Sequence, residues 1–192
     1  RLGARLAICG RNPEKLESAA EFLRSFGGEV MAREMTIRDP EQVAAFVDAV
    51  HERFGGLNVL VNNAGGQFPQ PALDFSIKGW NAVIDTNLNG TWWMMQAVAK
   101  NWVETGTQGN IVSIVADVWR GMPGIAHTAA ARAGVIFLSK SVAVEWAPYG
   151  VRVNCVAPGC CESTGFGNYP AEGAATFKES NPMRRAGDEW DV

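Results

Sequence analysis

The sequence alternates short apolar stretches with longer segments of helical periodicity, and this alternation limits the folds available to the chain. Apolar runs bounded by turn residues predict strands within 5–10, 29–35, 57–65, 109–117 and 151–159. The longer segments predict helices within 12–28, 39–56, 77–104 and 126–150. Strands that alternate with helices of this length form βαβ units with right-handed crossovers. We therefore predict an α/β fold, a doubly wound parallel sheet with helices on both faces.

Two of the helical segments carry matching start and stop signals. Asn12 and Asp39 are typical helix N-cap residues. Each is followed by a proline, which suits the first helical position. Each segment then ends at a pair of glycines, 27–28 and 55–56, where a left-handed backbone can close the helix. The boundaries of these two helices are therefore predicted from local chemistry.

The composition excludes several classes of protein. Of the 192 residues, 47% are hydrophobic and the formal net charge is −3, so the chain can bury a core but offers no basic surface for nucleic acid or an anionic membrane. No apolar run approaches the roughly 20 residues of a transmembrane helix, and the first ten residues do not resemble a signal peptide. We expect one domain over residues 1–192, in the cytoplasm, with no nucleic-acid or membrane partner.

The four cysteines do not predict a metal site. Cys9 and Cys155 lie inside apolar runs, where a free cysteine behaves as a small hydrophobic residue. Cys160 and Cys161 are adjacent, and neither histidine stands at a ligand-like spacing from them. A reducing compartment is the simplest setting for such a chain.

In a parallel α/β sheet, ligands bind beyond the carboxyl ends of the strands. This rule directs attention to 10–11, 62–66, 116–117 and 158–163, which are rich in Gly, Asn and Pro. Arg11 directly follows the first strand, where a guanidinium can bind a phosphate with two hydrogen bonds. A solvated loop arginine is the alternative.

Three motifs resemble the short-chain dehydrogenase/reductase family: VNNAGG at 61–66, TNLNGT at 86–91 and AVEWAPYGVRVNCVAPG at 143–159. The likeness extends from the first residue to about Pro182 and implies a Rossmann-type fold. More narrowly, segments 62–94 and 127–135 look like the peroxisomal trans-2-enoyl-CoA reductases and bacterial relatives labelled citronellol/citronellal dehydrogenases. Members of the family are commonly dimers or tetramers, so a homo-oligomer, with a homotetramer as one form, is expected.

The resemblance also shows what is absent. Family members open with a strand and a Gly-rich turn that holds the dinucleotide pyrophosphate, and they close with a further strand; neither has a match here. We expect the chain to be an internal fragment of a longer protein. Losing a central strand exposes backbone groups and part of the core, so the piece expressed alone is expected to fold poorly.

By resemblance, a set of residues holds NADP(H) in preference to NAD(H). Arg11 sits where NADP-preferring members bind the adenosine 2′-phosphate, and a guanidinium attracts a phosphate dianion. The Asn63-Ala64-Gly65 turn supports the cofactor and the central sheet. Pro158 and Gly159 begin the loop that cradles the nicotinamide carboxamide, with Ser163 further along. Loop or turn stabilisation is the alternative for each.

The resemblance also locates the catalytic positions, and two are substituted. The family's Tyr and Lys, four residues apart on one helix face, read Thr128 and Arg132 here, and the Ser position reads Ala116. The family's Asn, which anchors a water relay, is Asn87. Arg132 can still donate to ribose hydroxyls. An aliphatic alcohol is too weak an acid to replace a phenol, so the apparatus for carbonyl reduction is missing.

These substitutions favour hydride transfer from NADPH to the C=C bond of a trans-2-enoyl-CoA thioester, a reaction of fatty acid metabolism. Such a reaction needs hydrogen-bond donors at the thioester oxygen and a proton that water can supply. A citronellol-type alcohol dehydrogenase with a terpenoid substrate is the first alternative. An inactive dinucleotide-binding subunit is the second.

The roles of several polar and aromatic residues remain open from sequence. A neutral core or surface histidine is favoured for His127 over a role in the site. Asp117 is either a loop carboxylate or a group that orients water or a donor. Arg184 and Arg185 either bind coenzyme A phosphates or end a solvated helix. The tryptophans of 80–102 are expected to serve packing or subunit contacts.

Overall fold

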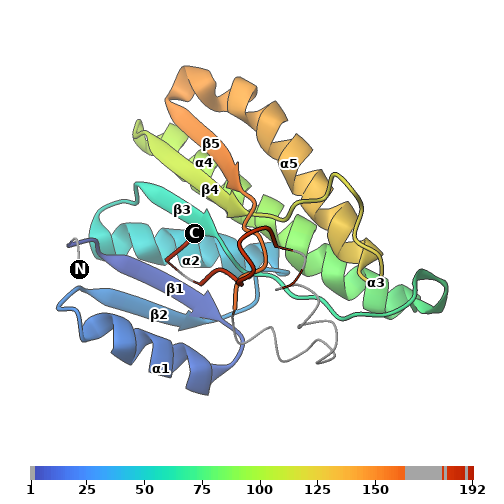
Figure 1. Cartoon of the computed structure of the whole chain (residues 1–192). Helices are drawn as coiled ribbons and strands as arrows, with labels where there is room; N and C mark the ends of the chain where they lie inside the picture. Colours follow the sequence, from blue (N-terminus) through green and yellow to red (C-terminus); the bar gives the residue numbers. More distant parts are fainter. Residues whose placement is uncertain (1–2, 163–178, 180, 189) are drawn as a thin grey trace.

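The computed structural model describes residues 3–162, 179, 181–188 and 190–192 (Figure 1). The strands are β1 (Leu6–Gly10), β2 (Val30–Glu34), β3 (Val59–Asn62), β4 (Gly109–Ile114) and β5 (Val151–Val156). The α-helices are α1 (Pro13–Arg24), α2 (Pro40–Phe54), α3 (Ile77–Ile84), α4 (Gly90–Thr105) and α5 (Ala126–Trp146). Shorter helical turns are η1 (Ala72–Asp74), η2 (Asp85–Asn89) and η3 (Ala147–Tyr149).

All strand pairs are parallel, which confirms the predicted α/β fold. They form two ladders: β1 pairs with β2, and β4 lies between β3 and β5. Among the described strands, β1 has β2 as its only neighbour and β3 has β4 as its only neighbour. The continuous parallel sheet that the sequence pattern suggested is therefore divided between β1 and β3.

The main core lies on the face of the strands that carries α2, α4 and α5. It joins Val43 of α2, Met95 and Trp102 of α4, Ile111 of β4 and Val142 of α5. The first helix, α1, packs against β1 and β2 on the opposite face, in front of them in Figure 1. Helices thus cover both faces, as a doubly wound fold requires.

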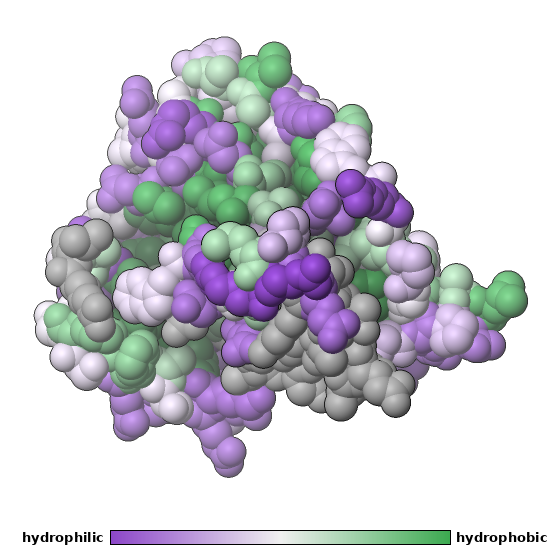
Figure 2. Space-filling model, viewed as in Figure 1, coloured by the Kyte–Doolittle hydropathy of each residue, from purple (hydrophilic) through white to green (hydrophobic). Residues whose placement is uncertain are grey.

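The opposite face of β3 is open. Val59 and Val61 are each 56% exposed, whereas the alternate residues Leu60 and Asn62 are buried against the helices. Figure 2 shows apolar side chains on this face, over the region of β3 to β5. The apolar run in β3 had predicted cover on both faces, and within the described residues only one face of this strand has it.

The predicted N-caps of α1 and α2 are present, but α1 ends at Arg24 with Ser25 as its C-cap, before the predicted glycine pair 27–28. The Asn12 side chain accepts the amide hydrogen of Lys15 at 2.8 Å, and Asp39 accepts those of Glu41 and Gln42 at 2.9 and 3.2 Å. Gly55 closes α2 with a left-handed φ of 72°. Within the described residues, no helix is long and apolar enough to cross a membrane.

The helix predicted over 77–104 is not one uniform α-helix. It is interrupted by η2, a five-residue π-turn in which the Gly90 amide donates to the Asp85 carbonyl. A Cβ at Gly90 would lie 2.7 Å from the Ile37 side chain, so this glycine allows the loop after β2 to approach the helix closely. Such π-turns inside α-helices often occur at functional sites, and this one contains Asn87.

Gly109 at the start of β4 provides a test of the core. A Cβ there would overlap the indole of Trp102, which is fully buried and donates its Nε1 hydrogen to the Leu57 carbonyl at 2.7 Å. We expect Gly109→Ala to lower the free energy of unfolding by about 1–3 kcal/mol through overpacking. Urea unfolding measures this change in the free energy of unfolding. Gly159→Ala, whose Cβ meets nothing within 4 Å, is the matched control, and an equal loss in both would contradict this account.

Candidate functional site

The carboxyl ends of the strands bring the predicted segments to one edge of the fold. Gly10 pairs with Glu34 at the ends of β1 and β2, and Ser113 lies in register with both Asn62 and Cys155 in the second ladder. Arg11, the 63–66 loop, Ala116 and Pro158–Gly159 follow directly from these strands. Ser163 lies outside the described residues.

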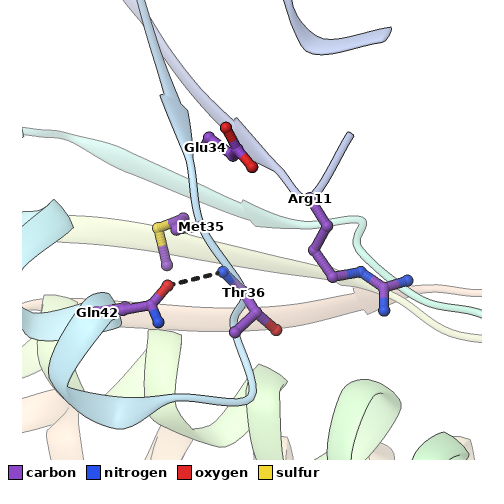
Figure 3. A pocket seen from close by; sticks show the side chains of 5 residues that line it. All are labelled: Arg11, Glu34, Met35, Thr36 and Gln42. Carbon is purple, nitrogen blue, oxygen red and sulfur yellow. Dashed lines mark hydrogen bonds between the residues drawn. The ribbon is translucent and has the colours of Figure 1, made fainter. Parts of the chain in front are cut away.

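Arg11 borders a shallow open pocket of about 310 Å³ between the ends of β1 and β2. Glu34, Met35, Thr36 and Gln42 complete its lining, and the Thr36 amide donates to the Gln42 side-chain carbonyl at 3.1 Å. Figure 3 shows the Arg11 side chain turned away from the Glu34 carboxylate. Among the described residues, none forms an ion pair or hydrogen bond with the exposed guanidinium. This geometry suits capture of an anionic group.

The loop after β3 is fastened by an asparagine on the neighbouring helix. Asn87, in the π-turn, is 1% exposed; its Oδ1 accepts the Gly66 amide at 2.9 Å and its Nδ2 donates to the Gly66 carbonyl at 3.0 Å. Its own backbone carbonyl accepts the Thr91 hydroxyl at 3.0 Å. The side chain predicted to anchor a water relay is therefore used to hold the loop. We call this pair of bonds the Asn87–Gly66 clamp.

Beside this clamp, the guanidinium of Arg132 lies against Gly65. A Cβ at Gly65 would overlap Arg132 Nη2 and lie 3.2 Å from Asn87 Oδ1. Burial lowers the pKa of Arg132, but a guanidinium remains charged in proteins. No hydrogen bond or ion pair joins Arg132 to any residue that the structure describes. The structure thus brings together Arg132, Asn87 and Gly65, and the partly buried Arg132 cation has no partner among the described residues.

Thr128 lies one turn before Arg132 on α5 and is 2% exposed. Its hydroxyl is 3.4 Å from Nδ1 of His127, and its amide donates to the same nitrogen at 2.7 Å. His127 is fully buried between Phe68 and Phe75. Of the two placements that the sequence left open for His127, core or surface, the structure has the core.

Other candidates lie apart from this group. Asp117 is exposed, and its carboxylate accepts the Trp119 amide at 3.4 Å. Arg185 forms two hydrogen bonds with Asp191, at 2.6 and 2.9 Å, which hold the pKa of that carboxyl at about 2. The charge of Arg185 is thus neutralised, which counts against its role in phosphate binding.

Pro158 is half-buried and Gly159 is exposed, at the end of β5. The next residues pair with the C-terminal segment, since the Gly187 amide donates to the Cys160 carbonyl at 2.8 Å and Glu162 donates back to Gly187. Asn63 and Ala64 are exposed in the loop that the Asn87–Gly66 clamp fastens. Among the described residues, no three His, Cys, Asp or Glu side chains come together as a metal site would require.

Sequence reasoning missed the Asn87–Gly66 clamp and the aromatic neighbours of His127. No local pattern announced the first, because the clamp joins residues 21 apart in the sequence and a Cβ at Gly66 would meet nothing within 4 Å. No local pattern announced the second, since Phe68 and Phe75 come from a distant loop.

A family model described as short chain dehydrogenase matches residues 1–172. The chain belongs to the short-chain dehydrogenase/reductase family. This confirms the likeness noted from the motifs, and the family is one of oxidoreductases that bind NAD(P).

Two curated relatives bear on the substrate. The Bacillus subtilis protein named "Probable 2,4-dienoyl-CoA reductase", (2E)-enoyl-CoA-producing, is 39% identical over 196 residues, which cover 100% of this chain and 77% of that protein. The peroxisomal 2,4-dienoyl-CoA reductase of Danio rerio, (3E)-enoyl-CoA-producing, is 35% identical over 198 residues, 100% of this chain and 65% of its own. The chain thus spans about two thirds to three quarters of these relatives.

Two solved structures are similar throughout. The citronellol catabolism dehydrogenase of Pseudomonas aeruginosa is 38% identical with a TM-score of 0.85, covering 100% of this chain and 74% of that one. A gluconate 5-dehydrogenase from Burkholderia cenocepacia, in complex with NADP and tartrate, is 31% identical with a TM-score of 0.88, covering 97% of this chain and 74% of that one.

The contact between Gly65 and Arg132 makes a specific prediction. We expect Gly65→Ala to displace the flexible guanidinium at little cost in stability and to weaken NADPH binding about tenfold, the size of one lost charge-assisted hydrogen bond. Arg132→Ala should have a similar effect, and the double variant should be no weaker than either single one. Nucleotide fluorescence titration measures the dissociation constants.

The control for this experiment is Gly66→Ala, because a Cβ at Gly66 meets nothing within 4 Å. We expect it to change NADPH affinity less than Gly65→Ala does. Additive effects of Gly65→Ala and Arg132→Ala would show that the two residues act independently and would contradict the contact.

Proposed function

We propose that this protein is an NADPH-dependent reductase of a C=C bond conjugated to an acyl-CoA thioester. The observation that carries the proposal is the pair Thr128 and Arg132, a buried hydroxyl and, one helical turn away, a guanidinium with no partner among the described residues. The names of the two dienoyl-CoA reductase relatives support the same substrate class. These names extend the proposed substrate class from the trans-2-enoyl-CoA thioesters that the sequence favoured to conjugated dienes.

The two side chains act as donors, and neither is an acid of useful strength. The Thr128 hydroxyl can donate to the thioester oxygen, where negative charge develops as the enolate forms. Arg132 carries a permanent charge in a partly desolvated position, where its field is strong. Reduction of an activated alkene requires this electrostatic support, whereas oxidation of an alcohol requires a base matched to that proton.

A bound reduced nicotinamide would supply the hydride. In this proposal Arg132 donates to the ribose hydroxyls, and the 63–66 loop, held by the Asn87–Gly66 clamp, supports the same edge. The alkene carbon next to the thioester carbonyl then takes a proton from water. Asn87 contributes by fixing the loop.

The NADP preference rests on Arg11. Its exposed, unpaired guanidinium lies beside the pocket at the ends of β1 and β2, and a phosphate dianion is its best partner. A further carboxylate, expected in many family members beside the adenine, is Thr36 here. The absence of that negative charge favours the phosphorylated dinucleotide.

A terpenoid alcohol dehydrogenase is the second candidate, because one structural neighbour is a citronellol catabolism dehydrogenase. The missing phenol and ammonium argue against it. Three assays on the purified protein separate the functions: oxidation of NADPH with trans-2-hexenoyl-CoA, the same with a 2,4-hexadienoyl-CoA, and reduction of NADP or NAD by citronellol. Thioester-dependent loss of NADPH absorbance is the expected result. Turnover of citronellol alone would replace the proposal with the second candidate, and cofactor binding without any turnover would indicate an inactive dinucleotide-binding subunit.

Arg11 can be tested separately. We expect Arg11→Ala to raise the dissociation constant of NADPH about tenfold or more, the size of a lost charge-assisted phosphate contact, and to leave that of NADH nearly unchanged. Arg24→Ala, on the far end of α1 where Arg24 pairs with Glu17, is the matched control. A parallel loss of affinity for both nucleotides would contradict a 2′-phosphate role.

Thr128 allows a graded test. Thr128→Ala should lower kcat about 100-fold, as expected when one donor to a developing oxyanion is removed. Thr128→Ser keeps the hydroxyl and should retain most of the rate. Steady-state kinetics with the best thioester measures both. Equal rates for the alanine and serine variants would rule out the hydroxyl as donor.

A further inference from the structure

The imidazole of His127 is held rigidly next to Thr128. The Phe75 ring stacks on it, with centroids 4.5 Å apart and 19° between the planes, and the Phe68 ring meets it edge-on at 4.6 Å and 78°. Both rings come from the segment between β3 and α3, and His127 itself is 0% exposed. The ring therefore has one orientation relative to the start of α5.

Its hydrogen bonds define which nitrogen carries the proton. Nδ1 accepts the Thr128 amide hydrogen at 2.7 Å, so Nδ1 must present a lone pair and the proton must reside on Nε2. Burial lowers the pKa of His127, although the backbone carbonyls of Ile125 and Phe68 oppose the shift. The ring is thus neutral near pH 7, and Nδ1 is a permanent acceptor.

This acceptor gives a second partner to an amide in the first turn of α5. The first amides of an α-helix have no partner within it, and Ile125, at the N-cap of α5, supplies no side-chain acceptor. The Thr128 amide is shared between the Ile125 carbonyl at 3.0 Å and His127 Nδ1 at 2.7 Å. The shorter bond goes to the histidine.

The same arrangement leaves the Thr128 hydroxyl hydrogen available. Oγ1 is 3.4 Å from Nδ1, a long contact, and the lone pair of that nitrogen already receives the amide. No shorter hydrogen bond joins this hydroxyl to a described residue. A buried hydroxyl in this state gains most from an acceptor that a ligand brings.

The histidine is not the best choice for packing alone. Its Nε2 is buried and has no hydrogen-bond partner among the described residues. A buried donor without an acceptor costs stability, and a phenylalanine would fit the aromatic surroundings without that cost. A local loss of stability of this kind is typical of residues that serve a functional site.

We propose that His127 is a positioning residue, which through Nδ1 holds the Thr128 amide and so aims the Thr128 hydroxyl at the substrate oxygen. The proposal rests on the proposed function for its catalytic part. Its structural part, the lone pair on Nδ1, is independent of the substrate.

Two variants distinguish positioning from packing, because their order of melting temperature should be the reverse of their order of kcat. His127→Phe keeps the aromatic contacts and removes both ring nitrogens, so its melting temperature should equal or exceed that of the natural protein. His127→Asn loses the ring contacts but places an amide oxygen where Nδ1 lies, so it should melt lower. For kcat the order should reverse: about tenfold lower in the phenylalanine variant, the size of one neutral hydrogen bond, and closer to natural in the asparagine variant.

The tautomer is measured by nitrogen NMR of labelled histidine. The other histidine of the chain, His51, lies in the last turn of α2, near the amino ends of the strands. His51→Gln assigns the signals and should leave kcat unchanged. An unprotonated Nδ1 on His127 together with opposite rankings supports the proposal.

A proton on Nδ1, or a kcat order that follows the melting order, overturns it. If the natural protein reduces no thioester, the proposed function fails by itself. The NMR result then decides whether His127 positions Thr128.

Discussion

The hydrogen bonds between the Asn87 side chain and both backbone groups of Gly66 fix the geometry of the ligand edge. They connect the π-turn of the long helical segment to the loop after β3. Gly65, the residue before the clamped glycine, lies against the Arg132 guanidinium, and a Cβ there would also lie 3.2 Å from Asn87 Oδ1. One amide side chain thereby sets the relative positions of a sheet loop and two helices. Family membership gives the fold, and this contact gives the site its shape.

In the proposed function, the chemistry of the site follows from a charge that is present but cannot be transferred as a proton. Arg132 retains its charge under all ordinary conditions, and Thr128 does not ionise. Both can stabilise an oxyanion, and neither can deprotonate an alcohol. A fold shared with many dehydrogenases therefore does not fix the reaction. The substituted pair restricts it more than the fold does.

Local chemistry made the helix starts predictable, because the Asn12 and Asp39 caps depend on residues within one turn. The strand ends and Arg11 followed from the same alternation of elements. The π-turn could not be predicted from the sequence, because its residues have ordinary helical periodicity. It accompanies the close approach of Ile37 and a hydrogen bond to a distant loop. The surroundings of His127 were hidden for a similar reason: Phe68 and Phe75 reach it only in the folded chain. The division of the strands into two ladders agrees with the expectation that a central strand of the family is absent.

The open side of β3 has a consequence for how the molecule associates. Its valines face solvent, and its backbone pairs with β4 alone among the described strands. An unpaired strand edge is a template for any extended chain. Self-association under stress should therefore proceed by intermolecular β-addition at this edge.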